Sequence, residues 1–200
     1  MLKIGLTGSI GTGKSTAAEI FRIKGIPVFD ADEEVHKLYK SDGMAVPLIR
    51  NLCSEAVENG AINRTILVEK IKNDPTLLDK IQKIIHPLVH EKRNNFIKEH
   101  VSKNTPFVIF DIPLLFETNA DKELDYVIVI TAPPAIQKRR LMLRSNMTEE
   151  KLAFFLERQM PNSEKIRRAD FVLNNDATIE ELKKQITKLL DKINETSKHA

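Results

Sequence analysis

The chain has 200 residues, of which 42% are hydrophobic and 30% are charged, a composition typical of a folded globular protein rather than a disordered one. Lysine and arginine total 31 against 28 aspartate and glutamate, so the formal net charge is only +3. Because nucleic-acid-binding proteins usually concentrate basic charge, we expect no nucleic-acid partner. No apolar run is long enough to span a bilayer, so we expect no membrane association.

Five short apolar runs predict buried parallel strands, because they are rich in Val, Ile and Phe and too short for helices. They are residues 2–6, 27–29, 107–110, 126–130 and 171–173. A helical pattern over residues 14–24, ending at Gly25, separates the first two runs. Strand, helix and strand in this order form a βαβ unit, so the sequence predicts an α/β fold with a parallel sheet between layers of helices.

Helical periodicity dominates residues 35–101, where no strand pattern occurs. We expect several short helices in this part of the chain, divided at Pro47, Gly60, Pro75 and Pro87. A second helical pair is predicted over residues 137–159, and residues 179–193 predict an amphipathic helix with Thr178 as its N-cap. Cys53, the single cysteine, excludes an intrachain disulfide and is interpreted as a packing residue. With no signal-peptide pattern at the N-terminus, we expect a cytoplasmic protein.

Residues 8–15 read Gly-Ser-Ile-Gly-Thr-Gly-Lys-Ser and match the phosphate-binding pattern G-x-x-x-x-G-K-[ST]. Glycines let main-chain N–H groups approach phosphate oxygens, and the following helix directs the positive end of its dipole at the anion. We therefore expect a bound nucleoside triphosphate, with Lys14 at the β- and γ-phosphates and the Ser15 hydroxyl on Mg²⁺. The loop residues expected to bind it are Gly8, Gly11, Thr12, Gly13, Lys14, Ser15 and Thr16.

ATP is the expected nucleotide, because the chain lacks features of GTPases. It has no Asn-Lys-x-Asp guanine-reading motif, and Asp-Ile-Pro-Leu at residues 111–114 stands where a GTPase has Asp-x-x-Gly. The phosphate loop alone names no reaction, since GTPases, motor ATPases and small-molecule kinases share it.

Carboxylates follow two of the predicted strands, where the ligands of doubly wound sheets bind. Asp30-Ala31-Asp32 follows the second strand, and because alternate strand residues point to opposite faces, we expect only one of the two aspartates to face the site. The aspartate that faces the site could accept the proton of an attacking hydroxyl; the alternative is that both are helix N-caps. Asp111 ends an apolar strand, the Walker B pattern that holds Mg²⁺, with a turn aspartate as the alternative.

Arginines cluster in the predicted helical pair of residues 137–159. Arg140 and Arg144 are four residues apart and share a helix face, and Arg139 lies beside them. In small kinases such helices form a lid that closes over ATP and places arginine against the transferring phosphoryl group. The alternative is a solvated basic face. His86 is a lone histidine, which is most often structural.

Together these features resemble the dephospho-CoA kinase family, from about residue 3 to 193. The Asp-Ala-Asp of residues 30–32 and the Asp-Ile-Pro-Leu-Leu-Phe-Glu of residues 111–117 are more specific than the phosphate loop. Further matches are Arg64, His86-Pro87, Arg140, Arg144, Arg158-Gln159 and residues 169–173. Two positions depart from the family: Ser9 stands where a glycine is usual and must adopt that backbone conformation, and Ala177 replaces a glycine in the loop expected near the adenine.

The resemblance implies that ATP, with Mg²⁺, phosphorylates the 3′-hydroxyl of the ribose of dephospho-CoA, which is the last step of coenzyme A synthesis. It implies catalytic roles for Asp32 (as the base), Lys14, Arg140 and Arg144. It places Asp32, Arg64, His86 and Leu114 at the substrate, Asn175 at the nucleotide, and Ser15 and Asp111 at the metal.

The resemblance also implies one kinase domain in three parts. These are a P-loop NTPase core of about residues 1–34, 104–136 and 165–200, a helical CoA-binding insertion of about residues 35–103, and a lid of about residues 137–164. We expect a monomer or a weak homo-oligomer. Two alternatives stay open: another small-molecule or nucleoside monophosphate kinase, and a nucleotide-dependent binding module or switch. The second alternative gives no role to Asp32 or to the arginines.

Overall fold

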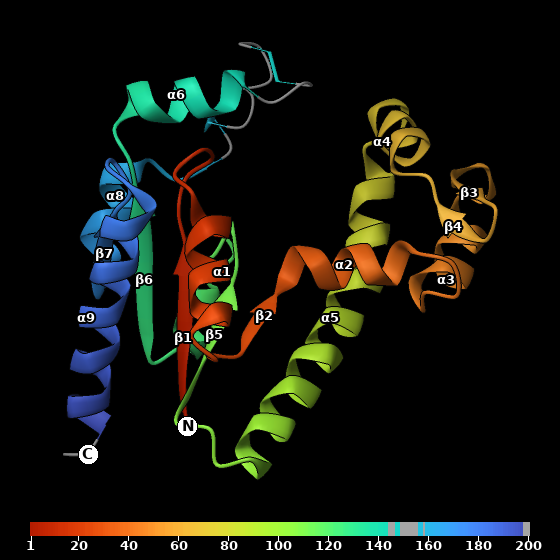
Figure 1. The fold of residues 1–200 in the computed structure, drawn as a ribbon. Coiled ribbons are helices and arrows are strands. Elements are labelled where there is room, and N and C mark those ends of the chain that lie inside the picture. Colours follow the sequence, from red (N-terminus) through yellow and green to blue (C-terminus); the bar gives the residue numbers. More distant parts are fainter. Residues whose placement is uncertain (144–146, 149–155, 158, 198–200) are drawn as a thin grey trace. The chain divides into compact units, whose positions relative to one another are not determined.

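The computed structural model describes residues 1–143, 147–148, 156–157 and 159–197. The chain divides into two compact units (Figure 1). Met1–Phe29 and Asn104–Ala200 form the first, which we call the sheet unit, and Asp30–Lys103 form the second, the helical unit. Within the described ranges, no helix combines the length and the apolar character needed to cross a bilayer.

A five-stranded sheet forms the centre of the sheet unit, and all five predicted strands are confirmed. Its order is β2 (Val28–Asp30), β5 (Phe107–Asp111), β1 (Leu2–Thr7), β6 (Tyr126–Thr131) and β7 (Phe171–Asn174). β1 pairs in parallel with β5 on one side and β6 on the other, so that Leu6 lies opposite Asp111 and Thr7 opposite Val129. β2 and β5 lie on one side of β1, and β6 and β7 lie on the other. The strand order therefore reverses at β1, and the carboxyl end of this strand is the switch point where such sheets bind ligands.

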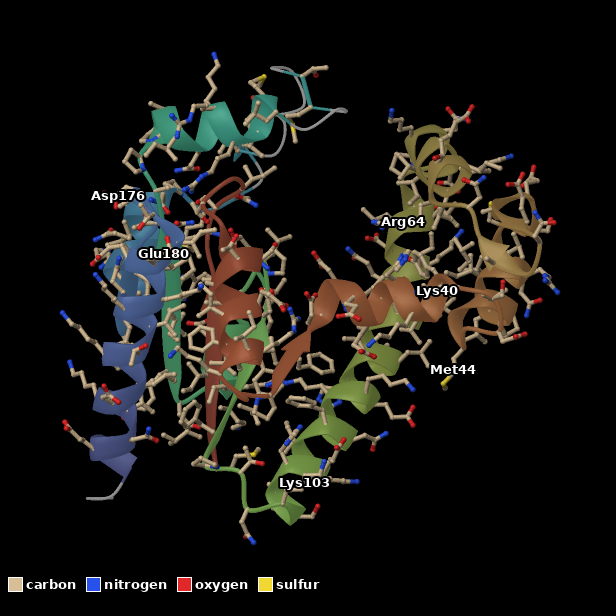
Figure 2. The ribbon with its side chains drawn as sticks, in the orientation of Figure 1. Lys40, Met44, Arg64, Lys103, Asp176 and Glu180 are labelled. Atoms are coloured by element: carbon tan, nitrogen blue, oxygen red, sulfur yellow. The ribbon has the colours of Figure 1, made fainter. Side chains whose placement is uncertain are left out.

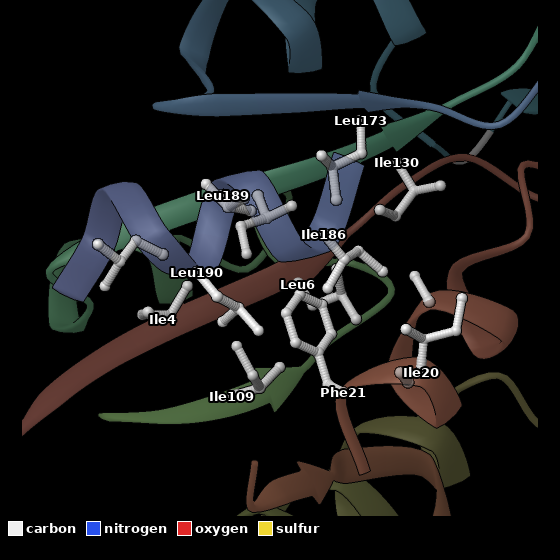
Figure 3. Close-up of a cluster of buried hydrophobic side chains, with 14 of the residues drawn as sticks. Ile4, Leu6, Ile20, Phe21, Ile109, Ile130, Leu173, Ile186, Leu189 and Leu190 are labelled. Atoms are coloured by element: carbon white, nitrogen blue, oxygen red, sulfur yellow. The ribbon is translucent and has the colours of Figure 1, made fainter. Parts of the chain in front are cut away.

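Helices cover both faces of the sheet, as the α/β prediction requires. α1 (Lys14–Ile23) and α9 (Ile179–Ser197) pack on one face, where Phe21 and Ile186 share a core with Ile4, Leu6, Ile109 and Ile130 of the strands (Figure 3). The other face packs around Leu115 and Val129, against the turn after β5, a short 3₁₀ helix η2 (Ala120–Glu123) and the segment that includes α8 (Asn162–Arg168). α6 (Pro134–Met142) follows β6.

Two predicted helix boundaries in the sheet unit are confirmed. α1 ends before Gly25, whose φ of 77° is the left-handed conformation that favours glycine. The Gly25 N–H bonds Arg22 O at 2.9 Å and the Ile26 N–H bonds Phe21 O at 3.0 Å, so the last carbonyls of the helix are satisfied. Thr178 caps α9, because its hydroxyl accepts the Glu181 N–H at 3.2 Å.

The helical unit contains α2 (Ala31–Tyr39), α3 (Ala45–Leu52), a 3₁₀ helix η1 (Ser54–Ala56), α4 (Arg64–Asn73) and α5 (Thr76–Ser102). Its core includes Leu38, Ile49, Leu67 and Ile81. Cys53 is 7% exposed and belongs to this core, so its interpretation as a packing residue is confirmed.

Two predictions for the helical unit are wrong. Pro87 does not divide two helices but lies inside α5. A proline removes one backbone hydrogen bond, and here Ile85 before it and Leu88 after it both pack against the unit's core, which stabilises the helix on either side of Pro87. The second error is the prediction that this unit has no strands, because β3 (Val57–Glu58) and β4 (Ala61–Ile62) form an antiparallel hairpin. Two-residue strands are too short to show periodicity, although Asn59-Gly60, with φ of 49° and 77°, is a typical hairpin turn.

The packing of α9 predicts a sharp difference between two apolar residues on this helix. Leu182 is 0% exposed and Ile179 is 52% exposed. Replacement of Leu182 by alanine should lower the free energy of unfolding by about 2–5 kcal/mol through lost burial and a cavity. Ile179→Ala should change it by no more than about 0.5 kcal/mol. Urea denaturation measures both, and equal effects would contradict the packing of α9 on the sheet.

Candidate functional site

The phosphate loop connects β1 to α1 at the switch point of the sheet. α1 begins at Lys14, and its N-cap is Gly13, which has φ 93° and ψ 27°. Only glycine adopts this left-handed conformation without strain. A Cβ atom at Gly13 would also collide with the Asn175 side-chain nitrogen, so both the backbone and its surroundings require glycine here.

Two side chains fasten the loop through one backbone carbonyl. The Thr12 carbonyl oxygen accepts hydrogen bonds from Asn175 Nδ2 at 2.8 Å and from Arg140 Nη1 at 3.3 Å. Within the loop, Thr12 Oγ1 donates to Ser9 O at 2.8 Å. Asn175 is only 6% exposed and follows β7 directly. The structure therefore gives Asn175 a role in shaping the loop, and its predicted contact with the nucleotide stays a prediction.

The first half of the loop is held by the segment that precedes and begins α8. Ser9 Oγ donates to Asn162 Oδ1 at 3.4 Å, and Asn162 Nδ2 donates to Thr131 Oγ1 at 2.7 Å. The Ile10 N–H bonds Gln159 Oε1 at 3.0 Å. Ser9 is not among the residues with positive φ, so the serine needs no conformation that is reserved for glycine.

Lys14 and Asp111, which the sequence assigned to one site, are in contact. Lys14 Nζ forms an ion pair with Asp111 Oδ1. The Asp111 side chain is only 2% exposed and the Lys14 side chain 16%, so the ammonium compensates a buried carboxylate. Ser15 is exposed in the first turn of α1, and Thr16 is half-buried beside it. The structure thus places the Lys14 ammonium against the carboxylate at the carboxyl end of β5.

The oxygen donors predicted for Mg²⁺ have suitable chemistry. Ser15 offers a hydroxyl and Asp111 a carboxylate, and Mg²⁺ is usually held by one or two such protein groups together with substrate phosphates and water. Within the described ranges, His, Cys, Asp and Glu side chains do not gather in groups of three or more that could hold a metal ion.

The predicted arginine cluster is placed in part. α6 confirms the first of the two predicted helices, and Arg140 on it is half-buried because its guanidinium reaches the phosphate loop. Arg139 is exposed. Arg144 and Arg158 lie outside the described residues, as does most of the second predicted helix. The Arg140 contact favours a site role over a solvated basic face for that residue.

The two aspartates at the end of β2 and the start of α2 differ in their contacts. Asp30 is the N-cap of α2, and its Oδ1 accepts the Glu33 N–H at 3.0 Å. Asp32 is exposed in the first turn of α2, where its negative charge interacts favourably with the positive end of the helix dipole. The argument from strand alternation is wrong, because the chain becomes helical at Ala31.

Two further predicted substrate residues belong to the helical unit. Arg64, labelled in Figure 2, is the exposed first residue of α4. It borders a hollow of about 550 Å³ along that helix. Burial raises the pKa of the Tyr39 hydroxyl, and the positive charge of Arg64 partly opposes this shift. His86 is exposed in the middle of α5. Leu114, in the sheet unit, is 40% exposed in the turn after β5.

Sequence reasoning missed a buried ion pair beside the loop after β5. Lys165 Nζ lies 2.9 Å from Glu117 Oε1, with side-chain exposures of 0% and 17%. Burial alone raises the pKa of the Glu117 carboxyl, but Lys165 and the Met160 N–H outweigh it and hold the pKa below its ordinary value. The sequence gives no local sign that Lys165 is buried. The usual hydrophobic pattern is reversed here, because α8 buries this lysine and leaves the neighbouring Ile166 37% exposed.

The fold and this site define a class of protein. A parallel sheet whose first strand leads into a glycine-rich loop, with the loop lysine on an aspartate at the end of the neighbouring strand, is the architecture of the P-loop nucleotide-binding proteins. Within this class, the chain belongs to the dephospho-CoA kinase family, whose model matches residues 2–181.

Individual relatives agree with the family over nearly the full chain. A dephospho-CoA kinase of Bartonella henselae is 48% identical over 183 residues, covering 92% of this chain and 93% of its own. One from Rhodopseudomonas palustris is 42% identical over 191 residues, covering 96% and 95%. A crystal structure of TT1252 from Thermus thermophilus is 32% identical with a TM-score of 0.80, covering 96% of this chain and 97% of that one.

The surroundings of Gly13 predict a cost beyond backbone strain. Gly25 also has a positive φ, 77°, but a Cβ there would meet no atom within 4 Å. Both Gly→Ala variants should lose about 1–2 kcal/mol to left-handed strain. Gly13→Ala should lose roughly a further 1–3 kcal/mol, because Asn175 must release the Thr12 carbonyl. Urea denaturation of the two variants measures the difference, and equal costs would show that Asn175 does not fasten the loop.

Proposed function

We propose that this chain transfers the γ-phosphoryl group of ATP to the 3′-hydroxyl of the ribose of dephospho-CoA, giving CoA and ADP. The observation that carries the choice of acceptor is the match of residues 2–181 to the dephospho-CoA kinase family. The geometry of the phosphate loop independently supports the donor. In the reaction a P–O bond to ADP breaks, a P–O bond to the ribose oxygen forms, and the hydroxyl proton leaves to a base.

The phosphate loop binds the triphosphate in this proposal. Its backbone N–H groups and the N-terminus of α1 face the phosphates, and Lys14 leaves or shares Asp111 to neutralise charge on the β- and γ-phosphates. Arg140, already at the loop carbonyl of Thr12, stabilises charge on the transferring group, and we assign the same role to Arg144. Ser15 and Asp111 would hold Mg²⁺, which when bound neutralises developing phosphate charge.

Asp32 is the proposed base, and Arg64, His86 and Leu114 are proposed contacts of the acceptor. An exposed carboxylate in the first turn of α2 is available to accept a hydrogen bond from a hydroxyl, whereas Asp30 already uses one carboxylate oxygen to cap the helix. The division into a core, a CoA-binding insertion and a lid belongs to the same proposal. So do a cytoplasmic location, the lack of a nucleic-acid partner and a monomeric or weakly associated state.

A substrate panel tests the proposed acceptor. ADP release should be fast with dephospho-CoA and at least about 10²-fold slower with AMP, CMP and shikimate, because only the correct acceptor aligns its hydroxyl with the γ-phosphate. Faster turnover of one of the other acceptors would favour another small-molecule kinase. ATP hydrolysis that is independent of every acceptor would favour a nucleotide-dependent switch.

The role of Asp32 has a matched control in the same helical turn. Asp32→Asn should leave ATP affinity nearly unchanged and lower kcat by about 10²- to 10⁴-fold, the usual loss for a general base. Glu33→Gln removes an exposed carboxylate one residue away and should leave kcat within about twofold. Steady-state kinetics measure both variants. Near-normal turnover of Asp32→Asn would leave Asp32 only its role at the helix N-terminus.

A further inference from the structure

Burial of the Glu117–Lys165 ion pair carries a desolvation free energy that a contact between apolar side chains at the same place would not carry. Lys165 is fully buried, and apart from the 2.9 Å ion pair its ammonium makes no well-aligned hydrogen bond to the described residues. The second Glu117 oxygen, Oε2, is likewise buried without a hydrogen-bond partner among them. Burying two charges is often no more stabilising than burying two apolar groups of similar size. This pair therefore calls for a role in positioning.

Glu117 is attached to the segment that holds the phosphate loop. Glu117 Oε1 accepts the Met160 N–H at 2.7 Å, and it is the same oxygen that pairs with Lys165 on α8. The residue before Met160 is Gln159, which accepts the Ile10 N–H at 3.0 Å. One carboxylate oxygen thus fixes the backbone of this segment directly beside its contact with the loop.

A second connection runs from the other side of Met160 to the same half of the loop. Asn162 Oδ1 accepts the Ser9 hydroxyl at 3.4 Å while Asn162 Nδ2 donates to Thr131 at 2.7 Å. Met160 lies between Gln159 and Asn162 in the chain, so a shift of its backbone would move both contacts. Glu117 in turn lies in the turn that follows β5, the strand that ends in Asp111.

We propose that Glu117 is a positioning residue for the phosphate loop. By holding the Met160 N–H, with Lys165 keeping its carboxylate in place, Glu117 fixes residues 159–162 so that Gln159 and Asn162 set the backbone of Ser9 and Ile10 for the phosphates of ATP. The inference deepens the proposed function, on which it rests only for the statement that this loop binds ATP.

Two double variants separate this role from the charge of the pair. Glu117→Gln with Lys165→Met removes both charges and keeps an oxygen that accepts the Met160 N–H. Glu117→Leu with Lys165→Met removes both charges and that acceptor as well. Neither leaves a single charge buried, which is what makes the individual replacements prone to misfolding. The full chain is used, with Mg²⁺ and ATP titrated by calorimetry and the apparent KM of both substrates measured.

The leucine variant should bind ATP roughly three- to tenfold more weakly than the glutamine variant, the effect of about one lost hydrogen bond. The KM for dephospho-CoA should stay within about twofold, because the acceptor is not held by this half of the loop. Leu189→Ala is the control for lost stability, since Leu189 is a residue of α9 that is buried in the core on the opposite face of the sheet. It should lower Tm without changing ATP affinity below the transition.

Equal ATP affinity in the two double variants would overturn the proposal, and so would a matching loss in Leu189→Ala, which would make the effect one of stability. A wild-type chain that binds ATP but does not phosphorylate dephospho-CoA would refute the proposed function instead. In that case the calorimetric comparison still decides the role of Glu117.

Discussion

The backbone conformation at the end of β1 is the constraint on which the rest of this structure depends. The chain must turn from a buried strand into α1 with its amide groups turned toward an anion, and Gly13 makes that turn with a φ of 93°. A loop of this kind has few contacts of its own, so other elements must hold it. Asn175 and Arg140 reach the Thr12 carbonyl from two different parts of the chain, and Gln159 reaches the Ile10 amide from a third.

Two ion pairs that contain a buried charged group lie near the loop. The buried Asp111 carboxylate is compensated by Lys14, whose stem is flexible and whose ammonium can move to a phosphate. The buried Glu117 carboxylate is compensated by Lys165, which is fully enclosed and has no comparable freedom. The first pair therefore suits a reaction in which charge is redistributed, and the second suits the maintenance of a fixed backbone.

Much of the fold could be predicted from the sequence because the signals are local. The five strands are continuous apolar runs, Gly25 ends α1, and the motif of residues 8–15 contains all the glycines its turn requires. Local patterns failed where packing decided the outcome. Pro87 stays inside α5 because apolar side chains before and after it pack against the same core, and the two-residue strands β3 and β4 have no periodicity to detect.

The candidate site shows the same division. Lys14 and Asp111 could be assigned to one nucleotide site from the sequence, because the phosphate-loop motif and an aspartate at the end of an apolar strand are local patterns, but their ion pair was not predicted and comes from the structure. Asn162 and Gln159 form hydrogen bonds with residues 31 to 153 positions away in the chain. Lys165, the partner of Glu117, lies on a polar helix. A pattern along the chain therefore does not reveal these contacts. Strand alternation was a wrong basis for the expectation that only one of Asp30 and Asp32 faces the site, because a helix begins at Ala31.

The central claim is the transfer of a phosphoryl group from ATP to one particular hydroxyl. The most direct test incubates the full chain with Mg²⁺, ATP and dephospho-CoA and locates the new phosphate on the product by ³¹P and proton NMR. We expect a single product with a monophosphate on the 3′ oxygen of the ribose, formed in equal amount to ADP. Phosphate on the 2′ oxygen, or ADP released with free inorganic phosphate and no modified acceptor, would contradict it.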